Sequence, residues 1–200
     1  MEIAIIDYGA GNVFSVATAF ERLGARVTVS GDENTIRRAD RVIFPGVGQA
    51  AAAMRRLKDT GLDRVIPTLQ QPVLGICLGM QLLCRHSSEG DVDGLDVFPL
   101  QAERFAAGLK VPHMGWNTLH GLRGGLFRGL EDGVRMYFVH SYYVPQNPFQ
   151  SASTQYGGTF ACALERDNFF GCQFHPEKSS AAGRRILENF LSKDIEKHLG

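Results

Sequence analysis

The sequence has no excess charge of either sign and no long hydrophobic run. Its 21 Lys and Arg residues balance 21 Asp and Glu residues, whereas proteins that bind nucleic acid or an anionic membrane through their overall charge have a basic excess. No apolar stretch approaches the roughly 18 residues of a membrane helix. The opening residues, MEIAIID, have no basic stretch that leads into an apolar one, so we expect no signal peptide. The sequence therefore predicts a protein that binds neither nucleic acid nor a membrane.

Cysteine is scarce as well. The four cysteines show neither the paired spacing of a metal site nor the density of a disulfide framework: Cys77, Cys84, Cys162 and Cys172. The six histidines are scattered, and no His-x-x-x-His pair could place two metal ligands on one helix face. We therefore expect reduced thiols, a cytoplasmic location, no metal and no other cofactor.

An apolar fraction of 44% excludes a disordered chain. A domain of this size buries about 70% of its unfolded surface, so one domain over residues 1–200 has enough core to be stable. The first half alternates expected strands with expected helices, which predicts a parallel sheet covered on both faces. The expected strands are 2–7, 25–30, 41–45 and 72–77, and the expected helices are 13–23, 32–39, a segment ending near 58, a weak one over 62–70, and 78–86.

The second half has a different pattern. Apolar segments separated by Gly, Asn and Asp turns predict further strands, which would extend the sheet in a mixed or antiparallel manner. These strands are 95–105, 135–143, 159–165 and 169–175. Residues 179–199 are expected to form one long amphipathic helix.

A glycine loop, YGAGN, follows the first expected strand. The dinucleotide pattern G-x-G-x-x-G would need a third glycine where Phe14 stands. The loop is therefore expected to be a tight turn at the sheet edge rather than a nucleotide site.

Cys77 has the context of a nucleophile. The segment Gly75-Ile76-Cys77-Leu78-Gly79 has the G-x-C-x-G pattern of a nucleophile elbow at a strand-to-helix junction, where flanking glycines permit a sharp turn. The following helix N-terminus favours a thiolate, and the Leu78 N–H could bind an oxyanion. A buried structural thiol is the alternative, and it suits the other three cysteines better. Gln81, one helical turn on, could hold a polar substrate or be a satisfied core residue.

His175 is the best candidate for the base that a catalytic thiol requires. It ends an apolar segment, and Glu177, two residues on, can reach its imidazole N–H, fix the tautomer and stabilise the imidazolium. The order Cys…His-x-Glu differs from that of the α/β-hydrolases. The loop Pro45-Gly46-Val47-Gly48 ends the neighbouring strand, so it is either a second oxyanion donor or an ordinary turn.

Taken together, PGVG at 45–48, GICLGMQLL at 75–83 and QFHPE at 173–177 resemble the signatures of the class I, triad-type glutamine amidotransferases. IIDYGAGN at 5–12, HMGWN at 113–117 and YFVHSYY at 137–143 are more narrowly similar to the glutaminase subunits of imidazole glycerol phosphate synthases. The resemblance covers the chain end to end. It implies an α/β fold with a mostly parallel central sheet, flanking helices and a mixed or antiparallel extension.

The resemblance also implies a mechanism. Cys77 would attack the side-chain amide of L-glutamine, and His175 would protonate the departing ammonia and activate water against the glutamyl thioester. Ammonia would pass to a separate TIM-barrel cyclase chain, the partner in a heterodimer, which makes imidazole glycerol phosphate and an aminoimidazole carboxamide ribonucleotide for histidine biosynthesis. The implied oxyanion donors are the backbone N–H groups of Leu78, Val47 and Gly48, and the implied glutamine contacts are Gly46, Gln81, His140, Ser141 and Tyr142.

Other functions stay open at this point. A paralogous amidotransferase for surface-sugar amidation would keep most of these motifs. A cysteine peptidase would need an open cleft, and a protein that only scaffolds a synthase would not need an intact triad.

Two segments around the expected site carry few charges. Residues 105–122 contain only Lys110, and residues 133–149 only Arg135, yet both are aromatic, as the core of a protein interface is. HMGWN, with a glycine and the single tryptophan, is expected to be a loop. The sequence thus predicts that Trp116 and Tyr137 line the synthase interface, with Lys178 making a polar contact.

Overall fold

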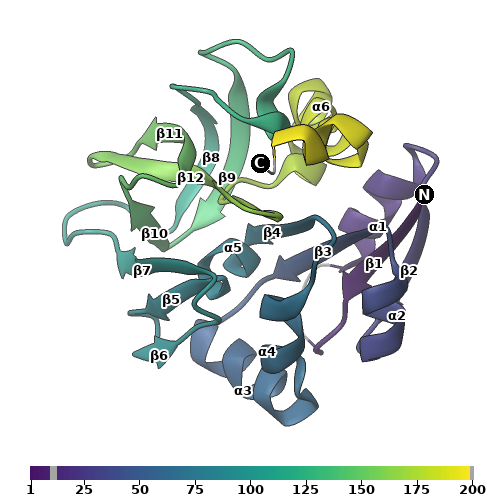
Figure 1. Cartoon of the computed structure of the whole chain (residues 1–200). Helices are drawn as coiled ribbons and strands as arrows, with labels where there is room; N and C mark the ends of the chain where they lie inside the picture. The colour runs from purple at the N-terminus through teal and green to yellow at the C-terminus, as the bar shows by residue number, and fades with distance from the viewer. Residues whose placement is uncertain (10–12, 199–200) are drawn as a thin grey trace.

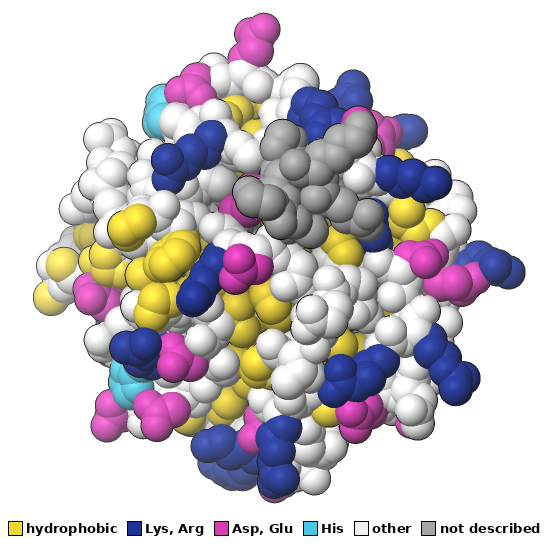
Figure 2. Space-filling view, in the orientation of Figure 1, with side chains coloured by type: hydrophobic (Ala, Val, Ile, Leu, Met, Phe, Trp, Pro, Cys, Tyr) yellow, Lys and Arg dark blue, Asp and Glu magenta, His cyan; other side chains and the backbone are white. Residues whose placement is uncertain are grey.

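A computed structural model describes residues 1–9 and 13–198, with backbone only from residue 196 on. Residues 10–12, the centre of the glycine loop, lie outside the described part of the chain. The face in Figure 2 has Lys and Arg side chains interspersed with Asp and Glu side chains, in keeping with the balanced composition. None of the helices in the described residues is long and apolar enough to cross a membrane.

The central sheet begins with five parallel strands. Their spatial order is β2 (Arg26–Ser30), β1 (Glu2–Ile6), β3 (Arg41–Gly46), β4 (Val73–Cys77) and β13 (Phe169–Cys172). From β13 the sheet continues mainly in antiparallel fashion, toward the left of Figure 1. These strands are β12 (Thr159–Arg166), β10 (Tyr142–Pro145), β7 (Phe98–Arg104), β5 (Cys84–Ser87) and β6 (Val92–Asp93), with β11 (Gln150–Gln155) paired to β12. The expected α/β architecture with an antiparallel extension is confirmed.

Alternating apolar residues explain why helices cover both faces. In β1, Ile3 and Ile5 join one core cluster, while Ala4 and Ile6 join the other, as the two-residue period of a strand requires. The first cluster includes α1 (Val13–Glu21) and α6 (Ser180–Leu191), which meet through the edge contact of Phe20 and Phe190. The second is covered by α2 (Glu33–Arg38), α3 (Ala50–Thr60), α4 (Leu62–Val65) and α5 (Leu78–Leu82).

The expected helix over 78–86 is wrong beyond Leu82, because residues 84–87 form β5. The carbonyls of Leu82 and Leu83 accept hydrogen bonds from Leu95 N and Phe98 N at 2.8 and 3.0 Å. The backbone at the end of α5 is therefore bonded to a distant segment, which redirects the chain into the sheet. Cys84, now on a strand, is still fully buried.

The expected C-terminal helix over 179–199 is also too long. Helix α6 ends at Leu191, Ser192 is extended, and a 3-10 segment, Lys193–His198, follows. The buried Arg41 donates to the carbonyls of Phe190 and Ser192 at 3.2 and 3.4 Å, so the last turn bonds to a side chain from β3.

The expected loop at 113–117 is a strand. Residues His113–Thr118 form β8, which pairs with β9 (Arg135–His140) as a separate two-stranded antiparallel sheet. Met114 and Trp116 are exposed on it, at 63% and 46%. The glycine and polar residues that suggested a loop belong to a surface ribbon. Residues 135–143 are likewise two strands, since β9 and β10 are separated at Ser141.

Candidate active site

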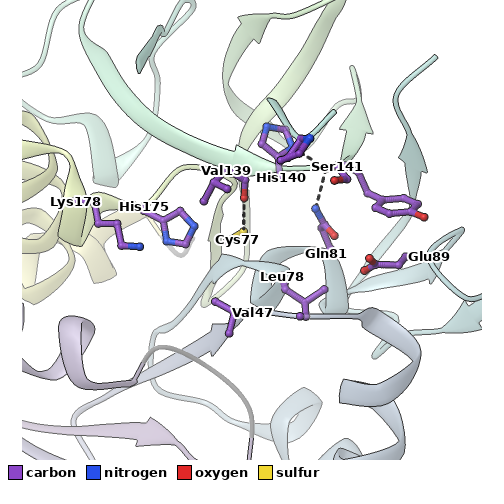
Figure 3. A pocket seen from close by; sticks show the side chains of 13 residues that line it. Val47, Cys77, Leu78, Gln81, Glu89, Val139, His140, Ser141, His175 and Lys178 are labelled. Atoms are coloured by element: carbon purple, nitrogen blue, oxygen red, sulfur yellow. Dashed lines mark hydrogen bonds between the residues drawn. The ribbon is translucent and has the colours of Figure 1, made fainter. Parts of the chain in front are cut away.

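A cavity of about 290 Å³ opens at the carboxyl ends of β3 and β4 (Figure 3). It brings together residues from the sheet edge, from the β9–β10 break and from the segment after β13. Its lining residues are Val47, Gly48, Cys77, Leu78, Gln81, Glu89, Pro112, Val139, His140, Ser141, Tyr142, His175 and Lys178. Most of the residues that the sequence predicted for one site therefore meet in one place.

Cys77 is the last residue of β4 and has φ 54° and ψ −110°. A non-glycine residue in this region is strained, which is common at functional sites. Its thiol lies 3.7 Å from the carbonyl oxygen of Val139 and 3.6 Å from Nε2 of Gln173. The turn presents the sulfur to the cavity at the sheet edge, as the elbow pattern predicted.

The glycines of the elbow are needed because neighbouring backbone leaves no room for a Cβ, not because they have a positive φ. A Cβ on Gly79 would lie 1.9 Å from the carbonyl oxygen of Phe44, and a Cβ on Gly75 would lie 2.8 Å from Met80 N. The conformational strain is carried by Cys77 itself. Gly46 has the same packing role, because its Cβ would lie 2.6 Å from Gly79 N. Gly46 supports the elbow and is not among the residues that line the cavity.

His175 and Glu177 form the expected pair. His175 Nδ1 lies 2.8 Å from Glu177 Oε1, and the two side chains are only 4% and 1% exposed. They follow β13 in a 3-10 turn, Pro176–Lys178, rather than in an extended strand, and the i, i+2 spacing still closes the contact. Nε2 of His175 is buried and makes no hydrogen bond within the described residues, so it is available to the Cys77 sulfur.

The electrostatics of His175 depend on the same neighbours. Burial alone lowers the pKa of His175, but the neighbouring Cys77 and Glu177 outweigh burial and raise it to about 9. A ring with this pKa is an imidazolium at neutral pH. An imidazolium beside a thiol favours the thiolate, the reactive form of cysteine.

The three residues whose backbone N–H groups are the predicted oxyanion donors all line the cavity with Cys77. Leu78 is the first residue of α5, where the N–H groups have no partner within the helix. Val47 and Gly48 line the cavity as well, and the register of β3 with β4 places Gly46 opposite Cys77. In Figure 3, Val47 and Leu78 lie on the same side of Cys77.

Gln81 lines the cavity and is also tied into the core. Its Nε2 donates to the carbonyl oxygen of Tyr142 at 2.9 Å and to Oε1 of Gln173 at 2.8 Å. The side chain of Gln81 is therefore satisfied within the core, and a contact with substrate stays a prediction. The amide nitrogen is used within the protein, so Gln81 can offer a ligand only its oxygen, which accepts hydrogen bonds.

His140 is among the residues that line the cavity, and its ring points away from Cys77 in Figure 3. Its Nδ1 lies 2.7 Å from the carbonyl oxygen of Tyr142, and its Nε2 lies 2.9 Å from Nδ1 of His113. Burial lowers the pKa of His140 to about 3 and that of His113 to about 4. Both rings are therefore neutral. Their hydrogen bonds fix the backbone on either side of Ser141, where β9 ends and β10 begins.

Two residues near Cys77 were not predicted from the sequence: Glu89, which lines the cavity, and Gln173, whose side chain contacts both Gln81 and the Cys77 sulfur. Glu89 lies at the opposite end of the cavity from His175 and Lys178 (Figure 3). One carboxylate oxygen, Oε2, accepts from Ala50 N at 2.9 Å, and burial raises the pKa of this group. Glu89 lies in a polar stretch between β5 and β6, and no motif distinguishes it from a surface residue.

The three residues predicted for an interface have different surroundings. Lys178 is exposed and lines the cavity, next to His175 in Figure 3. Trp116 and Tyr137 lie opposite one another in β8 and β9, with ring centroids 6.2 Å apart, and neither lines the cavity. Among the described residues, no three His, Cys, Asp or Glu side chains gather as a metal site.

Comparison with known proteins agrees with this geometry. The family model described as glutamine amidotransferase class-I matches residues 4–193. The chain is 53% identical to the imidazole glycerol phosphate synthase subunit HisH of Bacteroides fragilis (strain YCH46), over 96% of this chain and 99% of that protein. It is 48% identical to the protein of the same name from Moorella thermoacetica, over 99% and 97% of the two chains, and 47% identical to that of Salmonella typhimurium, over 96% and 99%.

Solved structures show the same fold at lower identity. A putative GMP synthase component from Thermoplasma acidophilum superposes with a TM-score of 0.75 at 19% identity, covering 95% of this chain and 92% of that one. A glutamine amidotransferase from Thermotoga maritima superposes with a TM-score of 0.65 at 17% identity, covering 100% and 86%.

Proposed function

Because the chain belongs to the class I glutamine amidotransferase family, we propose that it is the glutaminase subunit of an imidazole glycerol phosphate synthase in histidine biosynthesis. Its reaction is the hydrolysis of L-glutamine to L-glutamate and ammonia. The observation that carries this assignment is that Cys77 and His175 line one cavity, with the buried Glu177 carboxylate 2.8 Å from Nδ1 of His175 behind them. Relatives about half identical over nearly the whole chain, all named for this synthase, favour it over surface-sugar amidation.

The triad performs the chemistry in two steps. The Cys77 thiolate attacks the side-chain amide carbon of glutamine, and the imidazolium of His175 gives its proton to the departing ammonia. This leaves a glutamyl thioester and a neutral imidazole. His175 then removes a proton from water, the hydroxide attacks the thioester, and the proton returns to the Cys77 sulfur or stays on the ring. Glu177 holds the ring and stabilises its charged form in both steps.

The cavity also orients the substrate. The oxygen that becomes negative in each tetrahedral intermediate would be held by the N–H groups of Leu78 and of the Val47–Gly48 loop. The rest of glutamine then extends toward Gln81, Tyr142 and Glu89. Glu89 supplies a carboxylate where the α-ammonium group of the substrate needs an opposite charge. A cavity of about 290 Å³ suits one amino acid and offers no extended cleft for a peptide.

The ammonia is used by a separate cyclase, which is a TIM barrel and forms a heterodimer with this chain. Ammonia released into bulk water would be protonated, so the two chains must seal the contact near Cys77. The test is to measure glutamate release from glutamine by this chain alone and with the cyclase. We expect a complex and a faster release in its presence. Absence of glutamine hydrolysis by a folded complex, or cleavage of casein instead, would refute the assignment.

Replacing Glu89 by glutamine should weaken glutamine binding more than it slows the chemistry. The carboxylate charge is lost, whereas an oxygen that can accept from Ala50 N is kept. Loss of a charged hydrogen bond corresponds to an increase in KM of about 10- to 100-fold, with kcat within about threefold. Steady-state kinetics of the complex measure both values. Glu131→Gln, an exposed change outside the cavity, is the control, and an unchanged KM in Glu89→Gln would exclude the ammonium contact.

Replacing Trp116 by alanine should weaken binding of the cyclase. Trp116 is exposed, packs edge-on against Tyr137 and lies on a ribbon with few charges. If it is an interface hot spot, Trp116→Ala costs about 2 kcal/mol or more of binding free energy. Titration calorimetry measures the loss, and the emission of the single tryptophan should shift when the cyclase is added to the parent protein.

Val29→Ala is the matched control, since Val29 is similarly exposed, at 45%, on the edge strand β2. Equal affinities for the parent and for Trp116→Ala, with no emission shift, would remove Trp116 from the interface.

A further inference from the structure

The segment that carries the triad base is hydrogen-bonded to strand β9 at Tyr137. The backbone N–H of His175 donates to the carbonyl oxygen of Tyr137 at 2.9 Å. The backbone N–H of Tyr137 does not return this bond directly. It donates instead to the hydroxyl of Ser179 at 2.9 Å, and that hydroxyl donates to the carbonyl oxygen of His175 at 2.7 Å.

The hydrogen positions in this ring of bonds are fixed by chemistry. A backbone N–H can only donate and a carbonyl oxygen can only accept, whereas a hydroxyl does both. The Ser179 hydroxyl must therefore accept from Tyr137 and donate to His175. In an antiparallel pair, two facing residues exchange both bonds directly. Here the hydroxyl takes the place of one of them and bridges the wider gap.

Capping of the helix, the usual role of a serine at a helix N-terminus, does not explain where the Ser179 hydroxyl points. Ser179 is the N-cap residue of α6, where a serine side chain normally accepts from the helix backbone. Its side chain makes no such capping bond. It is fully buried and turned toward His175 and Tyr137.

Helix α6 packs tightly against the turn that contains Pro176 and Ser179. Gly183 N donates to the carbonyl oxygen of Ser179 at 3.0 Å, and a Cβ on Gly183 would lie 2.7 Å from the Cβ of Ser179 and 2.0 Å from the carbonyl oxygen of Pro176. The main chain of Ser179 is thus held by α6, while its hydroxyl holds the main chain of His175.

Resting on the proposed function, we propose that Ser179 is a positioning residue that holds the His175 ring in line with Cys77 and Glu177. Ser179 does not line the cavity and touches no substrate, so it acts only through His175. Its loss should affect proton transfer and leave substrate binding intact.

The test compares Ser179→Ala with the parent in the complex with the cyclase. We expect kcat for glutamine to fall about 10- to 100-fold, as for a catalytic group displaced by about 1 Å, with KM within about twofold. Cysteine is similar in size to serine and is a weaker donor, so the kcat of Ser179→Cys should lie between those of the parent and Ser179→Ala. Ser180→Ala changes the exposed neighbour in the same turn and should match the parent.

A second measurement does not depend on glutamine. The rate of alkylation of Cys77 by iodoacetamide, followed on its peptide by mass spectrometry, reports the imidazolium beside the sulfur. In Ser179→Ala it should fall about 10-fold at pH 7 and approach the parent rate at pH 10, where the parent His175, with a pKa of about 9, is mostly neutral. This result would stand even if the parent failed to hydrolyse glutamine, which would refute the proposed function alone.

Three outcomes would overturn the role of Ser179. The first is a folded Ser179→Ala variant with the kcat and alkylation profile of the parent. The second is an effect on KM alone. The third is failure of both Ser179→Ala and Ser179→Cys to fold, as judged by thermal unfolding, because Ser179 would then be only a structural residue.

Discussion

Replacing Cys77 by alanine should abolish glutamine hydrolysis and leave the ammonia-dependent synthase reaction intact. The variant lacks the only nucleophile that the elbow presents to the cavity, so we expect the glutaminase rate to fall by roughly 10⁴-fold or more. In the proposed function the cyclase chemistry lies on the other chain, so the complex should still form product from added ammonium salt. The two rates can be measured on one preparation, with glutamine or ammonium as the nitrogen source.

Cys162→Ala is the matched control for this experiment. Cys162 is fully buried in β12, and burial raises the pKa of its thiol, which stays protonated and unreactive. The control should lose some stability and keep both reactions. Glutamine hydrolysis by the Cys77→Ala protein, or loss of the ammonia-dependent reaction in a well-folded complex, would contradict the division of labour between the chains.

The centre of the site could be predicted from the sequence because its information is local. The elbow needs only a strand, a turn and two glycines around Cys77, and the base needs only a carboxylate two residues from His175. The rule that parallel strands end at one edge then brings the loop after β3 beside the elbow. These local pieces meet because β3 and β13 both pair with β4, and the sequence indicated this only through the family resemblance.

The parts that could not be predicted depend on contacts across the chain. Glu89 reaches the cavity because β5 and β6 join the far end of the sheet, which follows from the pairing of β5 with β7 rather than from the local pattern. The expected helix over 78–86 failed for the same reason. His140 could not be assigned a neutral ring turned away from the cavity without its partner His113, 27 residues away along the chain.

The roles of the glycines show a subtler limit. The pattern around Cys77 correctly indicated a sharp turn, but the left-handed backbone belongs to Cys77, and Gly79 is required because Phe44 of β3 approaches it. Gly46, predicted to contact substrate, packs against Gly79 and is not among the residues that line the cavity. A motif identifies which residues act together, whereas the neighbouring strand determines what each one does.

The two other members of the triad should differ in how much their removal costs. His175→Ala removes the group that transfers the proton in both steps, so we expect kcat to fall by about 10²- to 10⁴-fold or more. Glu177→Gln keeps a side chain of the same shape that can still bond to Nδ1, and it should be the milder change. Steady-state glutamine hydrolysis by the complex ranks the two variants.

The Glu177 charge also governs the pH dependence. Cys77 and Glu177 raise the pKa of His175 from its ordinary value of 6.5 to about 9. Protonated His175 therefore stabilises the folded protein fully below about pH 6.5, and this contribution is lost as the pH rises through 9. Glu177→Gln should therefore lower the free energy of unfolding more at pH 6 than at pH 10, as measured by urea denaturation. If the loss were equal at both pH values, or if Glu177→Gln were as inactive as His175→Ala while alkylation of Cys77 stayed normal, Glu177 would not act through the charge of His175.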